Sequence, residues 1–245
     1  MSRDPEPVSV AAPPLEGRVV AGQDWRTATF LHWRVDSSRV APLLPAGIRP
    51  DEFDGSSWVG LIAFRLERAR IAPFPPVPFF GDFTEVNVRL YGVDPDGRRG
   101  VVFRSLEAAR LPAVLAARAA YSIPYRWART ALDERDGVVH YRSDRILTRA
   151  RFRLAARPDR SAVVDDPLSA FLTARWALFT RHRGRTVRMP NAHEPWLLHP
   201  AAVEHLADDL VARAGLPGVV ERAPDSMLFS PGVSADFAAP RPVAP

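Results

Sequence analysis

The sequence Phe83-Thr84-Glu85-Val86-Asn87-Val88-Arg89-Leu90-Tyr91 alternates between polar and apolar side chains with a period of two. Because successive side chains of a β-strand point to opposite faces, this alternation predicts a strand over Thr84 to Tyr91. One face is apolar and carries Val86, Val88 and Leu90. The other face carries a carboxylate, an amide, a guanidinium and a phenol, from Glu85, Asn87, Arg89 and Tyr91.

The polar face of this strand has two interpretations. Neighbouring side chains on one face lie about 6.5 to 7 Å apart, so the row either faces solvent or an internal salt bridge, or it lines a ligand site. In an enclosed interior such a row costs free energy unless it binds a partner. Asn87 favours the ligand site, because only one other asparagine, Asn191, occurs in the 245 residues.

Further strand signals flank this segment. Asp94-Pro95-Asp96-Gly97 predicts a turn, and Val101 to Leu106 is expected to return as the partner strand. Trp58 to Leu66 is almost continuously apolar, which is typical of a strand covered on both faces. Other strands are expected around residues 123–132, 137–143 and 147–155, with one or two short edge strands after Ser226.

Helical signals are fewer. Asp36 is a predicted N-cap for a short helix through Leu44, and an Ala-rich helix is expected over Leu111 to Tyr121. A longer helix is expected after Asp166-Pro167, with apolar residues at spacings of three and four, namely Leu168, Phe171, Leu172, Trp176 and Phe179. A similar pattern runs from Val203 to Ala214. These elements together predict an α+β, mostly antiparallel β fold.

Residues 1–18 are Pro-rich and poor in apolar side chains, which predicts a flexible tail. No linker-like change of composition divides residues 19–245, so a single domain is expected there. No secretory signal is visible, and the apolar stretches are shorter than the roughly 18 residues of a membrane span. Together with the absence of cysteine, these features predict a cytoplasmic protein that does not enter a membrane.

The formal net charge is +5, and the arginines are spread among acidic residues. Arg181, Arg183, Arg185 and Arg188 form one cluster around Gly184. A solvated turn after a helix explains this cluster, whereas nucleic-acid binding through it predicts a steeply salt-dependent affinity. We favour the solvated turn and expect no nucleic-acid partner.

The absence of both lysine and cysteine removes two classes of covalent catalysis. A Schiff base needs an amine nucleophile, and a thioester or disulfide needs a thiol. No phosphate-binding loop, dinucleotide fingerprint or nucleophile elbow occurs. His193-Glu194-Pro195-Trp196-Leu197 begins like a zinc-protease helix, but it lacks the second histidine and contains a proline. We therefore expect neither a metal nor a cofactor.

The segment from His193 to Trp196 has two interpretations of its own. A turn fixed by Pro195 can hold His193 beside Glu194, and this pairing suits proton transfer near neutral pH. A structural turn held by hydrogen bonds accounts for the same residues.

Several motifs, in the same order along the chain, resemble those of a bacterial family of unknown function, the YqjF-like proteins. They include Phe83 to Arg89, Phe103-Arg104-Ser105-Leu106-Glu107-Ala108, Ile123-Pro124-Tyr125-Arg126-Trp127-Ala128-Arg129, Phe171-Leu172-Thr173-Ala174-Arg175-Trp176 and His193-Glu194-Pro195-Trp196. Leu43-Leu44-Pro45-Ala46-Gly47-Ile48 and the stretch from Asp54-Gly55 to Phe64-Arg65 fit as well. The resemblance covers roughly residues 28–237. This family is in turn similar to the acetoacetate decarboxylase superfamily.

The resemblance implies a curved, cone-like antiparallel β-barrel around a largely apolar pocket, with a few helices outside. It places the row of Glu85, Asn87 and Arg89 inside, and it suggests a strand from Trp196 to about Leu206 where the spacing suggests a helix. The lysine pair of true acetoacetate decarboxylases falls around residues 111–113, where this chain has Leu, Pro and Ala. The decarboxylase mechanism therefore does not transfer. Superfamily precedent favours a homo-oligomer.

These expectations lead to two functional hypotheses. The first is an enzyme in which Glu85 transfers a proton on a keto or enol acid, Arg89 binds a carboxylate or enolate oxygen and Asn87 orients a carbonyl, as a lyase, hydratase or isomerase. His193 and Glu194 close the rim of the pocket. Further candidate ligand-binding residues are Arg65, Ser105, Tyr125, Trp127, Trp176 and Trp196, although ordinary core positions also explain the tryptophans. The second hypothesis is a non-catalytic module that binds an apolar small molecule as a carrier or sensor.

Overall fold

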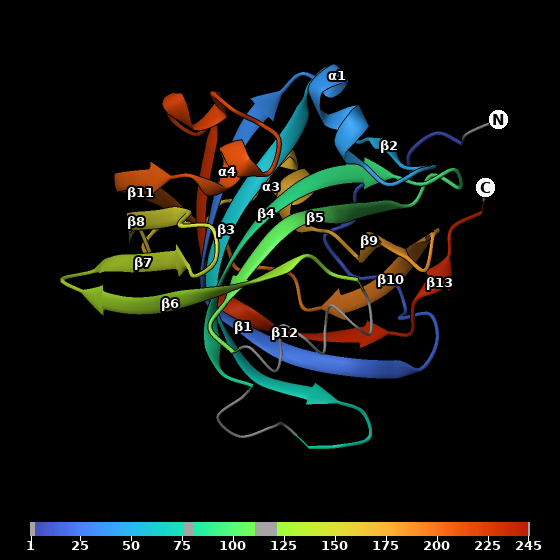
Figure 1. The fold of residues 1–245 in the computed structure, drawn as a ribbon, viewed down its shortest axis with the longest axis horizontal. Coiled ribbons are helices and arrows are strands. Elements are labelled where there is room, and N and C mark those ends of the chain that lie inside the picture. Colours follow the sequence, from blue (N-terminus) through green and yellow to red (C-terminus); the bar gives the residue numbers. More distant parts are fainter. Residues whose placement is uncertain (1–2, 76–80, 111–121, 245) are drawn as a thin grey trace.

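Strands dominate the computed structural model, which describes residues 3–75, 81–110 and 122–244 (Figure 1). In chain order the strands are β1 (Val19–Val35), β2 (Arg49–Pro50), β3 (Ser57–Ile71), β4 (Phe83–Val93), β5 (Arg99–Ala108), β6 (Tyr125–Arg135), β7 (Val138–Arg145), β8 (Arg151–Pro158), β9 (Ala177–His182), β10 (Arg185–His193), β11 (His199–Asp208), β12 (Ser226–Ala238) and β13 (Arg241–Pro242). The helices are short: α1 (Ser37–Val40), α3 (Pro167–Thr173) and α4 (Leu210–Arg213), with 3-10 turns at Ala41–Leu43 and Val219–Glu221.

The strands that the sequence predicts most clearly are confirmed. β3 and β4 pair antiparallel from Val59 opposite Leu90 to Leu66 opposite Phe83. β4 and β5 form the predicted hairpin, in which Gly97 donates its backbone N–H to the carbonyl of Asp94 at 3.0 Å. β4 is therefore hydrogen-bonded to a neighbouring strand along both of its edges, and neither edge is exposed.

The strands close on themselves, which gives the barrel-like fold of the acetoacetate decarboxylase type. One ring runs β10–β9–β5–β4–β3–β1–β12 and returns to β10. A second ring leaves β5 through β6, β7, β8 and β11 and returns to β12. Figure 1 shows β6, β7, β8 and β11 stacked on one side of the long central strands, and β9, β10 and β13 on the other. Strands β12, β1, β3, β4 and β5 belong to both rings.

This shared wall explains the alternation of Thr84 to Tyr91. On one side of it, Val86, Val88 and Leu90 pack in the main hydrophobic core together with Val139, Tyr141, Phe152 and Leu154 of β7 and β8. On the other side, the first ring encloses a cavity. Each residue of β4 therefore faces either the core or the cavity, and the period-two pattern assigns which one.

The helix expected to extend from Asp166-Pro167 to Phe179 is shorter than predicted. Asp166 caps it by accepting a 3.0 Å hydrogen bond from the backbone N–H of Ser169, but the helix ends at Thr173. Phe179 lies in β9, which pairs with β10. The apolar spacing that suggested one helix is divided between a helix and a strand that both bury their apolar residues.

The pattern from Val203 to Ala214 is mostly a strand, as the resemblance suggested. β11 pairs with β8, and its register shifts between Val203 and His205. This bulge inserts an extra residue, so Val203 and Leu206 both contact the main core at a spacing of three, which imitates a helix. Only Leu210–Arg213 is helical.

The short edge strand expected after Ser226 is present as β13, at the end of the sheet order, but the longer β12 is a central strand and not an edge. β12 pairs with β1, β10 and β11, and Gly232 within it has φ of 132°, a conformation that favours glycine. Pro231-Gly232 therefore interrupts the strand pattern without ending the strand. The predicted helix over Leu111 to Tyr121 lies outside the described residues.

The Arg181 to Arg188 cluster lies on the β9–β10 hairpin, so its turn at Arg183-Gly184 follows a strand rather than a helix. Arg188 is buried rather than solvated.

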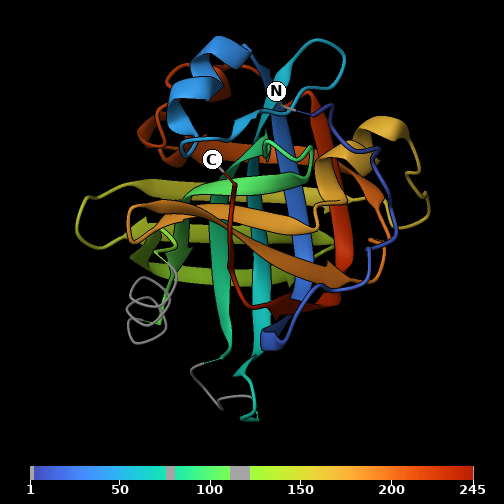
Figure 2. The ribbon, with the colours of Figure 1, turned by 90° about the vertical axis from the view of Figure 1, so that its right-hand side faces the viewer.

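Both chain ends lie on the side of the molecule formed by β9 and β10 (Figures 1 and 2).

Residues 3–18 contain no helix or strand, but they contact the rings at several points. The backbone N–H groups of Arg3 and Glu6 donate to the carbonyls of Pro95 and Gly97 at 3.0 and 2.9 Å. The indole of Trp176 donates to the carbonyl of Ser9 at 2.9 Å. Within the described residues, no helix is long and apolar enough to cross a membrane.

Candidate functional site

A cavity of about 710 Å³ lies inside the first ring and is lined by side chains from every strand of that ring. This volume is within the range of pockets that bind small organic ligands. Most of the wall is apolar, and its largest side chains are Trp25, Phe30, Phe64, Phe83, Phe103, Trp196 and Phe237. The polar residues are confined to a few positions, which are therefore the candidates for recognition or chemistry.

The row of Glu85, Asn87 and Arg89 lines this cavity. Glu85 and Asn87 are each 3% exposed, whereas Arg89 is half-buried. The row faces inward because the apolar face of β4 is taken by the main core. A polar row in an apolar enclosure is the arrangement that marks a binding or catalytic site.

Glu85 is held by two hydrogen bonds. Its Oε2 accepts from the Tyr125 hydroxyl at 2.7 Å, and its Oε1 accepts from Nδ2 of Asn87 at 3.2 Å. Burial raises the pKa of Glu85 to about 7, against the two hydrogen bonds, which stabilise the charged form. Burial and the neighbouring Glu85 raise the pKa of Tyr125 well above its ordinary value, so the phenol remains a donor.

Asn87 uses only half of its hydrogen-bonding capacity. Its amide nitrogen donates to Glu85, while its Oδ1 is buried and has no partner among the described residues. A buried amide oxygen without a partner is uncommon in folded proteins. Asn87 therefore acts at the cavity through its amide nitrogen, which holds Glu85.

Arg89 extends away from Glu85 toward the end of α3. Its Nε donates to the Tyr91 hydroxyl and its Nη2 donates to the carbonyl of Leu172, both at 3.1 Å. Among the described residues, no carboxylate lies within ion-pair distance of Arg89. The guanidinium is therefore positioned by neutral groups and keeps its charge uncompensated.

Arg175 also lines the cavity, although the sequence did not single it out. It is 4% exposed, with Nε donating to the carbonyl of Phe171 at 2.6 Å and Nη1 paired with Asp51 at 2.5 Å. Its Nη2 is buried without a partner among the described residues. Its signals in the sequence are its position within the apolar stretch from Phe171 to Phe179 and its place in the motif that ends at Trp176.

His193 completes the polar part of the wall. Its Nδ1 lies 2.7 Å from the carbonyl of Glu194 and donates to it, which leaves Nε2 as the acceptor. The imidazole lies among three indoles, with ring centroids 5.6, 4.6 and 5.1 Å from Trp25, Trp176 and Trp196. Burial lowers the pKa of His193, and Arg89 contributes in the same direction, so the ring is neutral near pH 7.

Two expected rim and wall residues lie elsewhere. Glu194 is exposed, and its Oε2 accepts from the backbone N–H of Ser234 at 3.2 Å, so it does not form a proton-transfer pair with His193. The two residues are adjacent in the chain, but His193 is the buried last residue of β10, whereas Glu194 follows the strand and is exposed. Arg65 is exposed and pairs with Glu67 at 2.8 Å outside the cavity.

The other expected ligand-binding residues divide in the same way. Tyr125 and Trp196 line the cavity. Ser105 lies opposite Val88 in the β4–β5 register, on the face of the main core. Trp176 packs against the ring of His193 but is not part of the described cavity wall. Trp127 is half-buried and is not part of that wall either.

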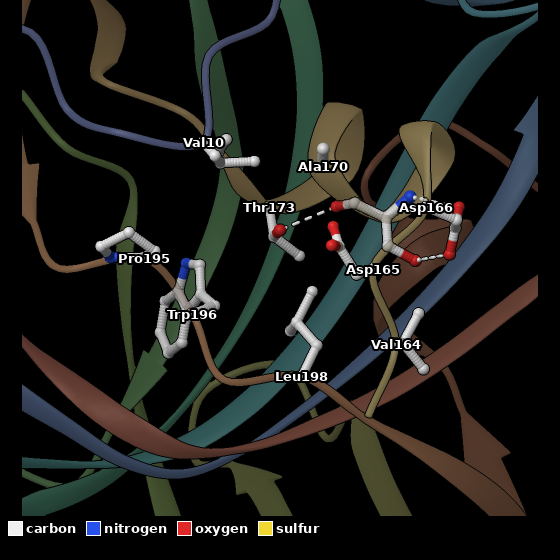
Figure 3. Close-up of a pocket in the computed structure, with 11 residues that line it drawn as sticks. Val10, Val164, Asp165, Asp166, Ala170, Thr173, Pro195, Trp196 and Leu198 are labelled. Atoms are coloured by element: carbon white, nitrogen blue, oxygen red, sulfur yellow. Dashed lines mark hydrogen bonds between the residues drawn. The ribbon is translucent and has the colours of Figure 1, made fainter. Parts of the chain in front are cut away.

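A second, smaller pocket of about 50 Å³ lies between α3 and the segment from Pro195 to Leu198 (Figure 3). Trp196 and Thr173 line both hollows, so they form the partition between them. Its volume suffices for single water molecules and not for an organic ligand. Across the described parts of the chain, no group of three or more His, Asp or Glu residues could hold a metal ion.

The closed rings of strands around an apolar cavity form a fold of the acetoacetate decarboxylase type. An acetoacetate decarboxylase-like enzyme from Sphingomonas wittichii RW1 superposes with a TM-score of 0.64 at 15% identity, over 93% of this chain and 94% of that one. The enduracididine biosynthesis enzyme MppR complexed with pyruvate superposes with a TM-score of 0.61 at 12% identity, over 98% of each chain. At these identities the likeness concerns the fold.

Sequence comparison is more specific. The model of the DUF2071 family, described as an uncharacterized conserved protein, matches residues 22–234. The uncharacterized protein YqjF of Bacillus subtilis (strain 168) is 32% identical over 192 residues, which cover 77% of this chain and 79% of YqjF. The chain therefore belongs to the DUF2071 family, as its motifs predicted.

Proposed function

We propose that the cavity binds an organic acid with a keto or enol group, and that Glu85 moves a proton on it without a covalent intermediate. The observation that carries this proposal is a buried carboxylate with a pKa of about 7 in the wall of an apolar cavity. Near neutral pH such a group exists in both protonation states, so it can accept and return a proton. Lyase, hydratase and isomerase reactions at a carbonyl fit this chemistry.

The neighbouring groups have complementary roles in this proposal. Glu85 removes a proton from the carbon beside the substrate carbonyl, and the C–H electron pair forms the enolate. Arg89 stabilises the negative charge of the substrate. Asn87 donates to Oε1 of Glu85, so in this proposal it positions that carboxylate instead of orienting the carbonyl as expected from the sequence.

A covalent route through an amine side chain is not part of the proposal, because the 245 residues contain no lysine. The structural neighbour MppR is complexed with pyruvate, and this supports a small keto acid as a starting probe. The fold is shared, whereas the reacting group differs.

Solvent hydrogen exchange tests the proposal directly. The protein is incubated in D₂O with keto acids whose carbonyl lies beside the carboxylate or several carbons from it, and the C–H signal beside the carbonyl is followed by NMR. We expect catalysed exchange, at least tenfold slower in Glu85→Gln. Glu204→Gln is the matched control, because Glu204 pairs with Arg157 on the exposed side of β11. Exchange at an equal rate in Glu85→Gln contradicts the proposed role.

A second candidate function, a carrier or sensor without turnover, is favoured by the predominantly aromatic wall around Trp25 and Trp196. This function predicts ligand binding with no exchange in either form of residue 85. Binding followed through tryptophan fluorescence, beside the exchange assay, separates the two functions.

A further inference from the structure

The polar end of the cavity contains two guanidinium groups that converge on one phenol. The Cζ atoms of Arg89 and Arg175 lie 5.6 and 4.8 Å from the ring centroid of Tyr91. Their N–H groups donate to the adjacent carbonyls of Leu172 and Phe171, at the C-terminal end of α3. These contacts hold both guanidinium groups beside the ring of Tyr91.

Positive charge exceeds negative charge at this end of the cavity. Asp51 is shared between Arg99 and Arg175, so two guanidinium groups have one carboxylate. Arg89 adds a third cation without an acidic partner among the described residues. Burial and the two arginines lower the pKa of the adjacent His32, so it remains uncharged and its Nε2 is hydrogen-bonded to Tyr91 at 2.7 Å. The remaining positive charge faces the cavity.

One donor at this end is unused. Nη2 of Arg175 is buried, lies in a residue of the cavity wall, and has no hydrogen-bond partner among the described residues. A buried guanidinium N–H without a partner costs free energy comparable to a lost charged hydrogen bond. Nη2 itself is closed off from the cavity, whereas Arg89 is only partly buried and lines it, so an anion bound at Arg89 compensates the excess charge of this end.

The rest of the cavity is long and apolar. Arg89 is four residues from Glu85, which is about 13 Å along a strand, and its guanidinium is directed toward Tyr91 and away from Glu85. The wall beyond is aromatic, with Trp196 stacked on Trp25 at 5.8 Å and edge-on to Phe30 at 5.1 Å. A three- or four-carbon acid leaves most of the 710 Å³ unfilled.

We infer that the cavity takes an elongated amphiphilic monocarboxylate, with its carboxylate at Arg89 in the field of Arg175 and its apolar body along the wall of Trp25, Phe30 and Trp196. This inference rests on the proposed function in one respect, namely that the cavity is the ligand site. It adds the class of ligand: an acid whose reactive group, if Glu85 acts on it, is separated from the carboxylate by several atoms. Straight-chain and aryl acids share this chemistry.

Titration of the full chain with matched ligands tests the inference, with tryptophan fluorescence as the signal. The probes are butanoate, octanoate and 4-phenylbutanoate, together with butanol and octanol as uncharged counterparts. We expect octanoate to bind at least tenfold more tightly than butanoate, because each buried methylene contributes up to about a fourfold gain. We expect octanoate to bind about tenfold more tightly than octanol, because charged hydrogen bonds are lost in the alcohol. Phenylbutanoate against octanoate distinguishes an aryl from an alkyl body.

The variants identify the carboxylate subsite. In Arg89→Gln the preference for octanoate over octanol falls to less than about threefold, while the preference for the longer chain remains. Arg175→Gln tests the second guanidinium, provided that the variant folds. If it does not fold, Arg89→Gln still provides the test, because Arg89 has no ion pair among the described residues whose loss would destabilise the protein. Arg135→Gln is the matched control, because Arg135 is 76% exposed on β6.

Each result supports or overturns the inference. Equal binding of octanoate and octanol, or an unchanged preference in Arg89→Gln, overturns the carboxylate subsite. Butanoate binding as tightly as octanoate overturns the elongated body. Failure of the proposed function is distinguishable, because it appears as exchange that is absent or independent of Glu85 while Arg89-dependent binding persists.

Discussion

The hydroxyl of Tyr125 donates a 2.7 Å hydrogen bond to Oε2 of Glu85 across the strand that separates them. Tyr125 begins β6, which pairs with β5, whereas Glu85 lies on β4. The bond stabilises the ionised form of Glu85, while burial favours the protonated form. The pKa of about 7 is a balance in which burial and the nearby Glu107 raise it and the hydrogen bonds from Tyr125 and Asn87 lower it, so the bond from Tyr125 can be tested by itself.

Tyr125→Phe removes a donor to the charged carboxylate and raises the pKa of Glu85 above its value of about 7. A hydrogen bond to a charged group contributes about 1.5–3 kcal/mol, which corresponds to a rise of about one to two pH units. The side-chain carboxyl signal of Glu85, titrated by carbon NMR, measures the change.

Tyr141→Phe is the control for this experiment. Tyr141 lies in the main core on the far side of the shared wall, where its hydroxyl is 2.9 Å from that of Thr29. The pKa of Glu85 is expected to be unchanged in this variant. If both variants shift it equally, the direct bond from Tyr125 is not the cause.

The pH dependence of stability provides a second test of Glu85. Its pKa is about 7 in the folded protein and near 4.5 ordinarily, so folding strengthens proton binding. The stabilisation is present below about pH 4.5 and is lost as the pH rises through 7. The full difference corresponds to about 3 kcal/mol. Glu85→Gln cannot lose a proton, so its stability relative to the native chain is expected to increase between pH 4.5 and 8.

Urea unfolding at several pH values between 4.5 and 8 measures this difference. Burial also raises the pKa of Asp208, to about 6, but this contribution is common to both proteins and cancels. Glu204→Gln, at an exposed position, is expected to follow the native pH dependence. Parallel curves for Glu85→Gln and the native chain would show that the carboxyl is not shifted.

The sequence predicts β3, β4 and β5 of the shared wall well, and its pattern is clearest in β4, which is paired on both edges and covered on both faces. Under those conditions the period-two alternation has one solution, with Val86 and Val88 toward the core and Glu85, Asn87 and Arg89 toward the cavity. The polar row could thus be identified without coordinates. Its inward direction came from the resemblance and not from the alternation itself.

Other features depend on interactions that local patterns do not contain. The bulge between Val203 and His205 changes the spacing of core residues and makes a strand resemble a helix. Arg175 lies just beyond the end of α3 at Thr173. Its guanidinium is held by an ion pair with Asp51, which is 124 positions away in the chain and therefore outside any local pattern. Neighbouring His193 and Glu194 have different surroundings because β10 ends at His193, which lines the cavity, while Glu194 follows the strand at an exposed position and binds the backbone of Ser234.

Asp51→Asn is expected to destabilise the protein strongly. Asp51 is 1% exposed and bridges Arg99 and Arg175, so the substitution leaves two cations without their shared carboxylate. Breaking a buried ion pair from one side costs about 3–5 kcal/mol. Urea unfolding measures the loss. In Asp133→Asn, which disrupts an exposed pair with Arg135, the loss is expected to stay below about 1 kcal/mol.

A similar loss for Asp51→Asn and Asp133→Asn would mean that the arginines find other partners. The octanoate assay then adds a second measurement on the same variant. Since Asp51 holds Arg175 in place, weaker discrimination between octanoate and octanol is expected even where Asp51→Asn remains folded.

Gly232→Ala tests how closely β12 approaches β1 at the cavity. Gly232 has φ of 132°, and an added Cβ would meet the backbone carbonyl oxygen of Trp25, which a side-chain rearrangement cannot relieve. Trp25 lines the cavity, so the strain is transmitted to the binding wall. A backbone conformation of this kind costs of order 1–3 kcal/mol for a non-glycine residue, and the steric conflict adds to it.

Gly184→Ala separates the two contributions. Gly184 also has positive φ, at 81°, but nothing lies within 4 Å of the position of its Cβ. We expect this variant to lose only about 1–2 kcal/mol, the cost of the left-handed conformation, and to bind octanoate normally. Gly232→Ala is expected to lose more in urea unfolding and to bind octanoate more weakly. Equal losses in the two variants would show that β1 shifts to accommodate the methyl group, and the cavity wall at Trp25 would then be deformable rather than fixed by the pairing of β1 with β12.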